Sequence, residues 1–430
     1  MREGAAPPLS DSVRPPAGLV DHFFRHEYGR LVAHLVRKVG VQKLELVEDA
    51  VQSALLAALT AWAPRGLPDD PGAWLYRAAF NQLVGTLRKH ARQERILERT
   101  AIETSHEVEA SELFRFKTEV HDDVLRMLFA CAEESLPRES RVVLALKTLC
   151  GFSAQEIASG LFTTEANVQK RLQRAREQLK AIHSEGSLDP PLESLVARLP
   201  SVHEVLYLLF NEGYLSSHAP FTIRRDLCEE AVRLATLLAE HPVGATAETH
   251  ALLALMHLHA ARFDARTDES GGLLLLEEQA RERFDTARIA VGLRWLQRSA
   301  TGEAFSRYHA EAGIAAEHCL ASSFETTRWS EIAALYQLLE ERAPSPLHQL
   351  NRAIAVAEWK GPEEALAILD AAPPPSWLER SYLWNAVLAD LHRRSGHREP
   401  FELHRARAVA GAPNEAVRIL LERRLSNMVG

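Results

Sequence analysis

Apolar residues recur at intervals of three and four along most of the chain, a spacing typical of amphipathic helices. Alternating apolar and polar runs, which would predict strands, are absent. Strong helix formers such as Ala, Leu, Glu and Arg dominate the composition. We therefore expect an all-α protein.

Pro- and Gly-rich or highly charged segments interrupt the helical pattern and divide the chain into modules. The predicted organisation is a disordered N-terminus at 1–19, a first helical module at 20–90, a charged linker at 91–121, a second helical module at 122–182, a hinge at 183–194 and a long helical domain at 195–430. A chain of 430 residues has ample length for several such domains.

The segment Phe152–Lys180 predicts two helices joined by a short turn. Ser153 and Glu156 have the spacing of a capping box, so a helix should begin at Ser153. Thr164 is a suitable N-cap for the second helix. One apolar stripe of the second helix should be buried, and it comprises Val168, Leu172, Ala175 and Leu179.

The second helix of this pair is basic, with five basic and two acidic residues between Glu165 and Lys180. A helix-turn-helix with a basic second helix can dock in a DNA major groove, although an ordinary helical hairpin with solvated arginines has the same pattern. The candidates for base or phosphate contacts are Glu165, Asn167, Lys170, Arg171 and Arg174. The sequence does not assign a role to each of them.

Two further motifs precede this pair. Val47–Trp62 reads VEDAVQSALLAALTAW and predicts a helix with a small apolar core face. On that helix Glu48, Asp49 and Gln52 should be exposed on another face. Asp70–Lys89 reads DPGAWLYRAAFNQLVGTLRK, and it begins a basic stretch, because Trp74–Arg95 contains five basic residues and one acidic residue.

In this order and spacing, the three motifs resemble the bacterial RNA polymerase sigma factors of the extracytoplasmic-function group. The resemblance implies two small helical sigma modules, the second with a helix-turn-helix. It implies that the first motif binds core RNA polymerase through Glu48, Asp49 and Gln52. The second motif would melt and read the −10 promoter element, and the helix-turn-helix would read the −35 element.

The resemblance also implies roles within the second motif. Trp74 is either a core anchor or an aromatic platform for unstacked promoter bases. Arg77, Arg88 and Lys89 could contact phosphates and Asn81 a base edge. The sequence departs from the family at four positions that usually carry charged residues, namely Phe80, Gln82, Gly85 and Thr86. Fewer cations should weaken non-specific affinity for DNA.

Residues 195–430 resemble the long C-terminal extension of one subgroup of these sigma factors, which is related to tetratricopeptide repeats. The segment LPSVHEVLYLLFNEGY at Leu199–Tyr214 carries this resemblance, followed by RRDLCEEAVRLA. Gly361 and Gly396 are offset by 35 residues, close to the period of about 34 in tetratricopeptide repeats. Ala357 and Ala365 are small enough for close helix packing. We therefore expect a repeat-like (TPR-like) domain with an interaction surface.

Several classes of protein find little support. No apolar run is long enough to span a membrane, the N-terminus lacks a signal-peptide core, and the four cysteines form no C-x-x-C pair, so we expect a cytoplasmic protein with free thiols. His250, His257 and His259 are close in sequence but lack the ligand spacing of a zinc site. No catalytic motif is present, so we expect no enzyme, no cofactor and no metal.

The leading hypothesis is a promoter-specificity subunit whose partners are core RNA polymerase and promoter DNA. A regulatory protein or ligand would act at the C-terminal domain, and no membrane partner is expected. One alternative is a one-component helix-turn-helix regulator with a ligand-sensing helical domain, and another is a TPR-like interaction scaffold. Neither alternative accounts for the first module. The inducing signal and the target promoters are not encoded in any motif that we identify.

Overall fold

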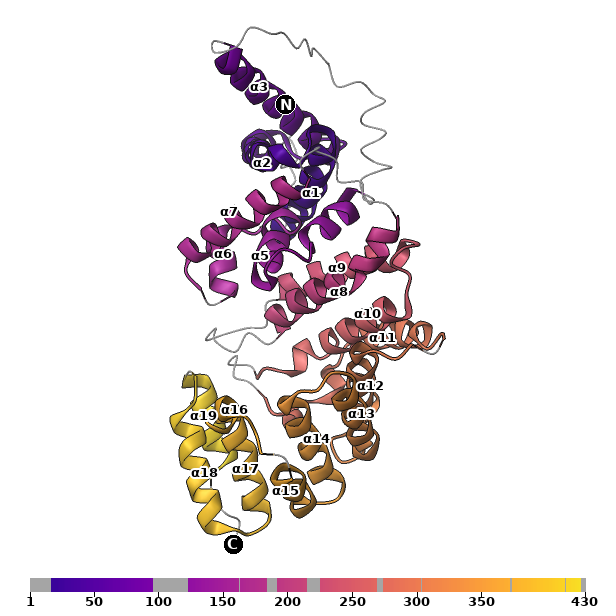
Figure 1. Cartoon of the computed structure of the whole chain (residues 1–430), viewed down its shortest axis with the longest axis vertical. Coiled ribbons are helices and arrows are strands. Elements are labelled where there is room, and N and C mark those ends of the chain that lie inside the picture. Colours follow the sequence, from indigo (N-terminus) through magenta and orange to yellow (C-terminus); the bar gives the residue numbers. More distant parts are fainter. Residues whose placement is uncertain are drawn as a thin grey trace, which may run out of the picture. The chain divides into compact units, whose positions relative to one another are not determined.

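Figure 1 shows the computed structural model of the chain, in which the described residues form helices and loops and no strand. The structure describes residues 17–426 apart from 96–122, 184–191, 215–224, 269–273 and the single positions 162, 303, 372 and 414. The predicted all-α class is confirmed. The chain forms two compact units, one built mainly of residues 1–190 and the other mainly of residues 191–430.

The first module of the N-terminal unit is a bundle of three long helices. They are α1 (Ala17–Val39), α2 (Leu44–Arg65) and α3 (Pro71–Arg95), with a short 3₁₀ turn η1 (Val41–Lys43) between the first two. Gly66 has a φ of 76° and ends α2, because this left-handed conformation is open to glycine. The Asp70 carboxylate accepts a hydrogen bond of 3.0 Å from the Ala73 amide and so caps the start of α3.

The second module carries the helix-turn-helix. Residues 123–131 are helical and are followed by α5 (Arg138–Thr148), α6 (Ala154–Gly160) and α7 (Glu165–Ile182). α5 packs on α7, and α1 of the first module packs on α5. The two modules therefore share one compact unit (Figure 1).

Gly29 sets how closely the two modules approach. A Cβ atom on Gly29 would lie only 2.0 Å from the Leu149 carbonyl oxygen, so any larger residue would push α1 away from the end of α5. Leu149 itself is fully buried. Close backbone contact of this kind requires glycine on one of the two partners.

A buried carboxylate also joins the modules. Asp123 lies at the start of the 123–131 helix and its side chain is fully enclosed. It contacts His34 Nδ1 at 2.6 Å and Arg37 Nη1 at 3.0 Å, both from α1, and Arg126 Nη1 at 2.9 Å. Two of its three partners belong to the other module, so the carboxylate depends on the packing of both.

The C-terminal unit is a succession of helices and three 3₁₀ turns. These are α8 (Leu192–Tyr214), α9 (Arg225–Glu240), α10 (Ala247–Ala260), η2 (Phe263–Ala265), η3 (Leu276–Glu278), η4 (Arg281–Arg283), α11 (Thr286–Ser299), α12 (Arg307–Leu320), α13 (Trp329–Arg342), α14 (Pro346–Trp359), α15 (Pro362–Asp370), α16 (Ser376–Glu379), α17 (Tyr382–Arg394), α18 (Arg398–Ala410) and α19 (Glu415–Arg424). Most helices pack on their immediate neighbours in sequence.

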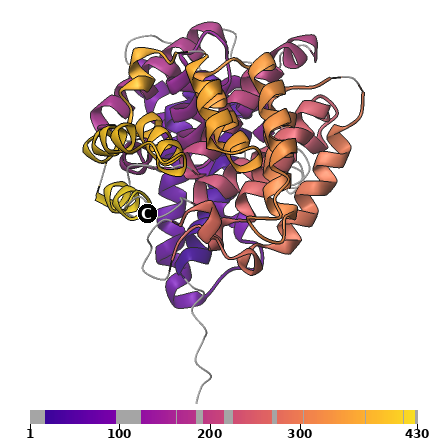
Figure 2. The same cartoon turned by 90° about the horizontal axis from the view of Figure 1, so that it is seen from below.

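The last helices have the hairpin geometry that the glycine spacing predicts. Gly361 joins α14 to α15 with a φ of 106°, and Gly396 joins α17 to α18 with a φ of 76°. Ala357 and Ala365 are buried where α14 meets α15, in a cluster that also contains Leu388 of α17. Figure 2 shows the two hairpins from below, where α17 lies beside the α14–α15 pair.

Three predicted boundaries fall partly outside the described residues. Of the N-terminal segment 1–19, residues 1–16 lie outside them and α1 begins at Ala17. Helix α3 extends to Arg95, into the predicted linker 91–121, whose remainder lies outside. Of the hinge 183–194, residues 184–191 lie outside and α8 begins at Leu192.

Candidate DNA and polymerase interfaces

The local sequence fixes where each helix of the helix-turn-helix begins. The Glu156 carboxylate accepts from the Ser153 amide at 2.8 Å, and the Ser153 hydroxyl accepts from the Glu156 amide at 3.2 Å. The predicted capping box is confirmed, with Ser153 as the cap and Ala154 as the first helical residue. The Thr164 hydroxyl accepts from the Asn167 amide at 3.2 Å and caps α7 as predicted.

Helix α7 buries one side and presents the other. The predicted apolar stripe of Val168, Leu172, Ala175 and Leu179 is buried. At 100° per residue, Asn167, Lys170, Arg171 and Arg174 fall on one face, on which Lys170 and Arg174 are exposed and the other two are partly exposed. Glu165 is exposed in the first turn on a different face. The structure thus brings four of the five candidates together.

Helix α3 carries the candidates for the −10 element along one stripe. Arg77, Asn81, Arg88 and Lys89 are exposed, and the helical rise of 1.5 Å per residue spreads Trp74 to Arg88 over about 21 Å. Trp74 is partly exposed. Its ring meets that of Trp62 edge-on at 5.4 Å between centroids, so it packs on α2 while keeping one edge accessible.

The four atypical positions on α3 have specific surroundings. The Phe80 ring stacks on that of Tyr76 at 5.9 Å, and the Lys38 ammonium of α1 lies 5.6 Å from the Phe80 centroid. A cation therefore sits beside Phe80 even though this residue is uncharged. The Thr86 hydroxyl donates to the Gln82 carbonyl at 3.0 Å, within the helix. A Cβ on Gly85 would meet nothing within 4 Å.

The predicted exposure of Glu48 is wrong. Its side chain is only 3 % exposed, and it pairs with Arg176 of α7. It also accepts a hydrogen bond of 3.1 Å from the Thr148 hydroxyl at the end of α5. Burial raises the pKa of Glu48, and the nearby Arg176 and Lys147 cations oppose this rise. The helical period puts Glu48 on the face of the buried Leu44 and Val51, so its burial could have been predicted. Its three partners could not, because they come from the other module.

Two further contacts hold the end of α7, one to the start of α2 and one to η1 just before it. Lys180 Nζ lies 3.1 Å from the Glu45 carboxylate, and the Gln42 amide group donates to the Lys180 carbonyl at 2.7 Å. Arg176 and Lys180 were counted with the basic face of α7, but in this arrangement they bind α2. Part of the basic charge of α7 is therefore paired within the protein, by carboxylates of α2.

The other predicted polymerase contacts on α2, Asp49 and Gln52, are exposed as expected. Sequence reasoning missed two apolar neighbours, Leu56 and Leu59, which are 66 % and 50 % exposed. The predicted core face of this helix comprises Ala50, Ala54, Leu55 and Ala58, and the exposure of these two leucines was not considered. Only their positions outside the Ala50, Ala54 and Ala58 stripe could have identified them. An exposed apolar pair on an otherwise well-packed helix is typical of a protein-binding surface.

Comparisons with known proteins agree with this geometry. Residues 24–93 match the sigma-70 region 2 family, and residues 126–179 match sigma-70 region 4. Residues 198–300 match a family of unknown function, DUF6596. No solved structure matches the chain. The two sigma matches cover the two modules of the N-terminal unit and define a sigma-70-type transcription initiation factor.

Relatives narrow this class. An uncharacterised protein of Rhizobium meliloti is 33 % identical over 89 % of this chain and 90 % of its own length. The ECF RNA polymerase sigma factor SigG of Mycobacterium tuberculosis is 28 % identical over 45 % of this chain and 59 % of its own. The ECF RNA polymerase sigma-E factor of Escherichia coli is 27 % identical over 36 % and 80 %. The chain belongs to the extracytoplasmic-function sigma factors, and it serves RNA polymerase in promoter recognition.

Among the described residues, little else resembles a metal-binding or catalytic site. It contains no group of three or more His, Cys, Asp or Glu residues placed to hold a metal ion. His257 and His259 lie on α10, where burial lowers the pKa of both imidazoles. Within the same residues, no helix has the length and apolar content needed to cross a membrane. All four cysteines are buried, and none forms a disulfide bond.

Replacing Arg171 or Arg174 by alanine should weaken binding to the −35 element. If the arginine reads a base, the loss should be about 1–3 kcal/mol and specificity should relax at one base pair. If it holds a phosphate, all sequences should bind more weakly and the salt dependence should become shallower. Binding titrations at several salt concentrations distinguish these outcomes, and Gln173→Ala on the same helix is the control. Wild-type affinity and salt dependence in both variants would show that α7 is not the reader.

Replacing Gly85 by lysine should strengthen DNA binding by α3. The position faces open space at the centre of the basic stripe, so a lysine there can reach a phosphate. The log–log slope of affinity against salt should steepen by about 0.7–0.9. Gly85→Ala is the matched control, because it improves helix propensity by about 1 kcal/mol without adding charge. An unchanged slope in the lysine variant would place this face of α3 away from DNA.

Proposed function

We propose that this sigma factor reads the −35 element with α7, reads the −10 element with the Trp74–Lys89 face of α3, and binds core polymerase with α2. We further propose that it does so only after its two modules separate. One observation carries the second part, namely the burial of Glu48 of α2 against Arg176 of α7. One side chain of the helix proposed to bind polymerase is thus buried against the helix proposed to bind DNA.

The geometry of promoter DNA supports separation. Elements centred near −10 and −35 are about 25 base pairs apart, which is about 85 Å at 3.4 Å per base pair. In the closed unit, α2 and α7 are in direct contact through their charged side chains. The segment 96–122 that joins the modules can extend to about 90 Å, so its length permits the open state.

The chemistry of the contact suits a reversible closure. The groups that join the modules are mainly charged, including Glu45 and Glu48 on one side and Arg176 and Lys180 on the other. Removing one partner from a closed buried pair is costly, about 3–5 kcal/mol, whereas full separation returns both charges to water. Opening would release Arg176 and Lys180 to bind phosphates and Glu48 to bind a basic polymerase surface.

The direct test is promoter-dependent transcription with purified core polymerase and a locked protein. Glu45→Cys and Lys180→Cys would be joined by a reducible bismaleimide, since the native cysteines are all buried. Locking should abolish transcription, because the modules cannot reach both promoter elements. Reducing the linker in the same sample should restore it. The two single-cysteine variants, each with a blocked thiol, control for labelling.

Gly29→Ala should have the opposite effect to the cross-link, because it should push the two modules apart. The added methyl group cannot fit against the Leu149 carbonyl, so it should favour the open state and increase polymerase binding. Gly85→Ala is a control with the same chemical change in open space. Full transcription by the locked protein would contradict the opening step. Absence of both transcription and core binding in the unlocked wild-type protein would contradict the promoter-specificity role itself.

We also propose that residues 195–430 control this activity, either by masking the N-terminal unit or by adding contacts to polymerase. The C-terminal unit has its own cores, for example around Phe401 and Ala408, which supports an independent domain. A truncation at Gly186 distinguishes the two modes. Masking predicts more transcription from the truncated chain, and a required contact predicts less. Equal transcription by both forms under every condition would contradict a regulatory role.

A further inference from the structure

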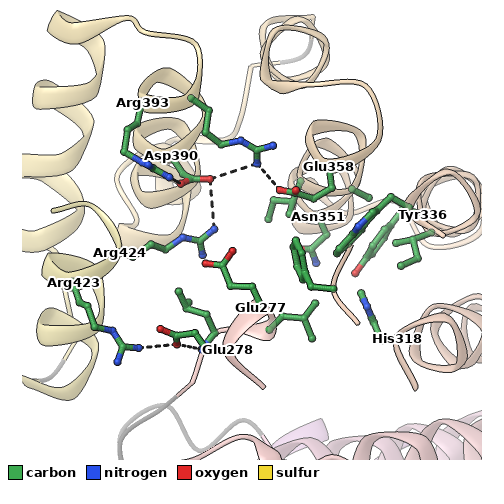
Figure 3. A pocket seen from close by; sticks show the side chains of 18 residues that line it. Glu277, Glu278, His318, Tyr336, Asn351, Glu358, Asp390, Arg393, Arg423 and Arg424 are labelled. Carbon is green, nitrogen blue, oxygen red and sulfur yellow. Dashed lines mark hydrogen bonds and ion pairs between the residues drawn. The ribbon is translucent and has the colours of Figure 1, made fainter. Parts of the chain in front are cut away.

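The C-terminal unit contains a cavity of about 550 Å³ between α13, α14, α17, α19 and η3. This volume lies within the range of about 300–1,000 Å³ that is typical of small-molecule sites. Its two ends differ in chemistry. Figure 3 shows aspartate and arginine side chains of α17 and α19 at one end and the rings of Tyr336 and His318 at the other.

The apolar end is rich in rings. Phe324, Trp329 and Tyr336 line it, together with Ile332 and Ile354. The His318 ring meets that of Trp329 edge-on at 5.5 Å, and burial beside Arg262 and Arg281 lowers the pKa of His318 to about 3. His318 is therefore neutral at pH 7, so this end of the cavity carries no charge. It suits a flat aromatic body.

At the polar end, most charges are already paired. Arg393 donates to Asp390 at 2.8 Å, Arg394 pairs with Glu358, and Arg423 donates to Glu278 at 2.8 Å. Each of these arginines therefore has a carboxylate partner, and Asp390 also lies 3.8 Å from Arg394.

Two groups are engaged less firmly. Arg424 makes no hydrogen bond to the described residues and has only a 3.6 Å ion pair with Asp390, a carboxylate that also accepts from Arg393. Glu277 is exposed and has no ion pair among those residues. Figure 3 shows the Glu277 carboxylate reaching toward the Arg424 guanidinium over the cavity. The site thus offers one anion partner and one cation partner close together, beside an aromatic floor.

We propose that this cavity binds a zwitterionic aromatic compound of the α-amino acid class. In such a molecule the carboxylate and the ammonium leave the same carbon atom, which matches the adjacent Arg424 and Glu277. Arg424 holds the carboxylate, Glu277 holds the ammonium, and the ring lies on Trp329 and Phe324. A hydrogen bond between charged partners stabilises binding more than one between neutral groups.

The test uses three probes with the same indole ring, and their binding to the full-length protein is followed by calorimetry. They are L-tryptophan, which is zwitterionic, indole-3-propionate, which is anionic, and tryptamine, which is cationic. L-tryptophan should bind best, at one site per chain. Arg424→Gln should weaken L-tryptophan and indole-3-propionate about tenfold but not tryptamine, and Glu277→Gln should weaken L-tryptophan and tryptamine but not the anion.

Matched variants locate the binding. Asn351 is an exposed residue of α14 that lines the cavity, so Asn351→Trp should fill the space and abolish binding of all three probes, whereas Asn351→Ala should not. Arg418→Gln and Glu282→Gln alter exposed charges outside the cavity and should have no effect. Circular dichroism would verify that each variant is folded.

Three results would overturn the proposal. The first is no binding of any probe at millimolar concentration. The second is binding that survives Asn351→Trp in folded protein. The third is wild-type binding of the anion or the cation as tight as that of L-tryptophan, since the ligand would then not be recognised by both charges.

Discussion

The ion pair between Glu48 and Arg176 is the interaction on which the N-terminal unit depends. A carboxylate that is almost fully enclosed needs a cationic partner, and the one that it has lies on a different module. The pair therefore links α2 of the first module to α7 of the second. It turns two small sigma modules, each with a modest core, into one compact body.

The backbone reinforces this electrostatic link. Gly29 allows α1 to approach the end of α5 with no side chain between them, and Asp123 draws His34 and Arg37 of α1 to the second module. Close packing and buried charge are both intolerant of partial separation. Under the opening step proposed above, such an interface would be either packed or apart, with little stability in between.

The C-terminal unit is stabilised mainly by contacts between helices that are close in sequence. Its helices pack mainly on sequence neighbours, so its stability accumulates from local hairpins such as α14–α15 and α17–α18. The cavity lined by Trp329, Glu277 and Arg424 lies where helices of several hairpins meet.

The sequence by itself determined the helical modules, their caps and their family. Ser153, Glu156 and Thr164 act through residues at most three positions away, so their caps were predictable. The apolar stripe of α7 follows from the helical period in the same way. Likewise, the offset between Gly361 and Gly396 fixed the hairpin register in the last helices.

Only the tertiary structure decided which polar groups are available. Glu48 lies on the helical face of the buried Leu44 and Val51, but the groups that neutralise it there, Thr148 and Arg176, are 100 and 128 positions away. The periodicity of one helix carries no information about a partner so distant in sequence. The cavity could be predicted even less from the sequence, because its Glu277 and Arg424 come from elements separated by most of the C-terminal unit. Local pattern sets the helices, and long-range packing sets the chemistry that they present.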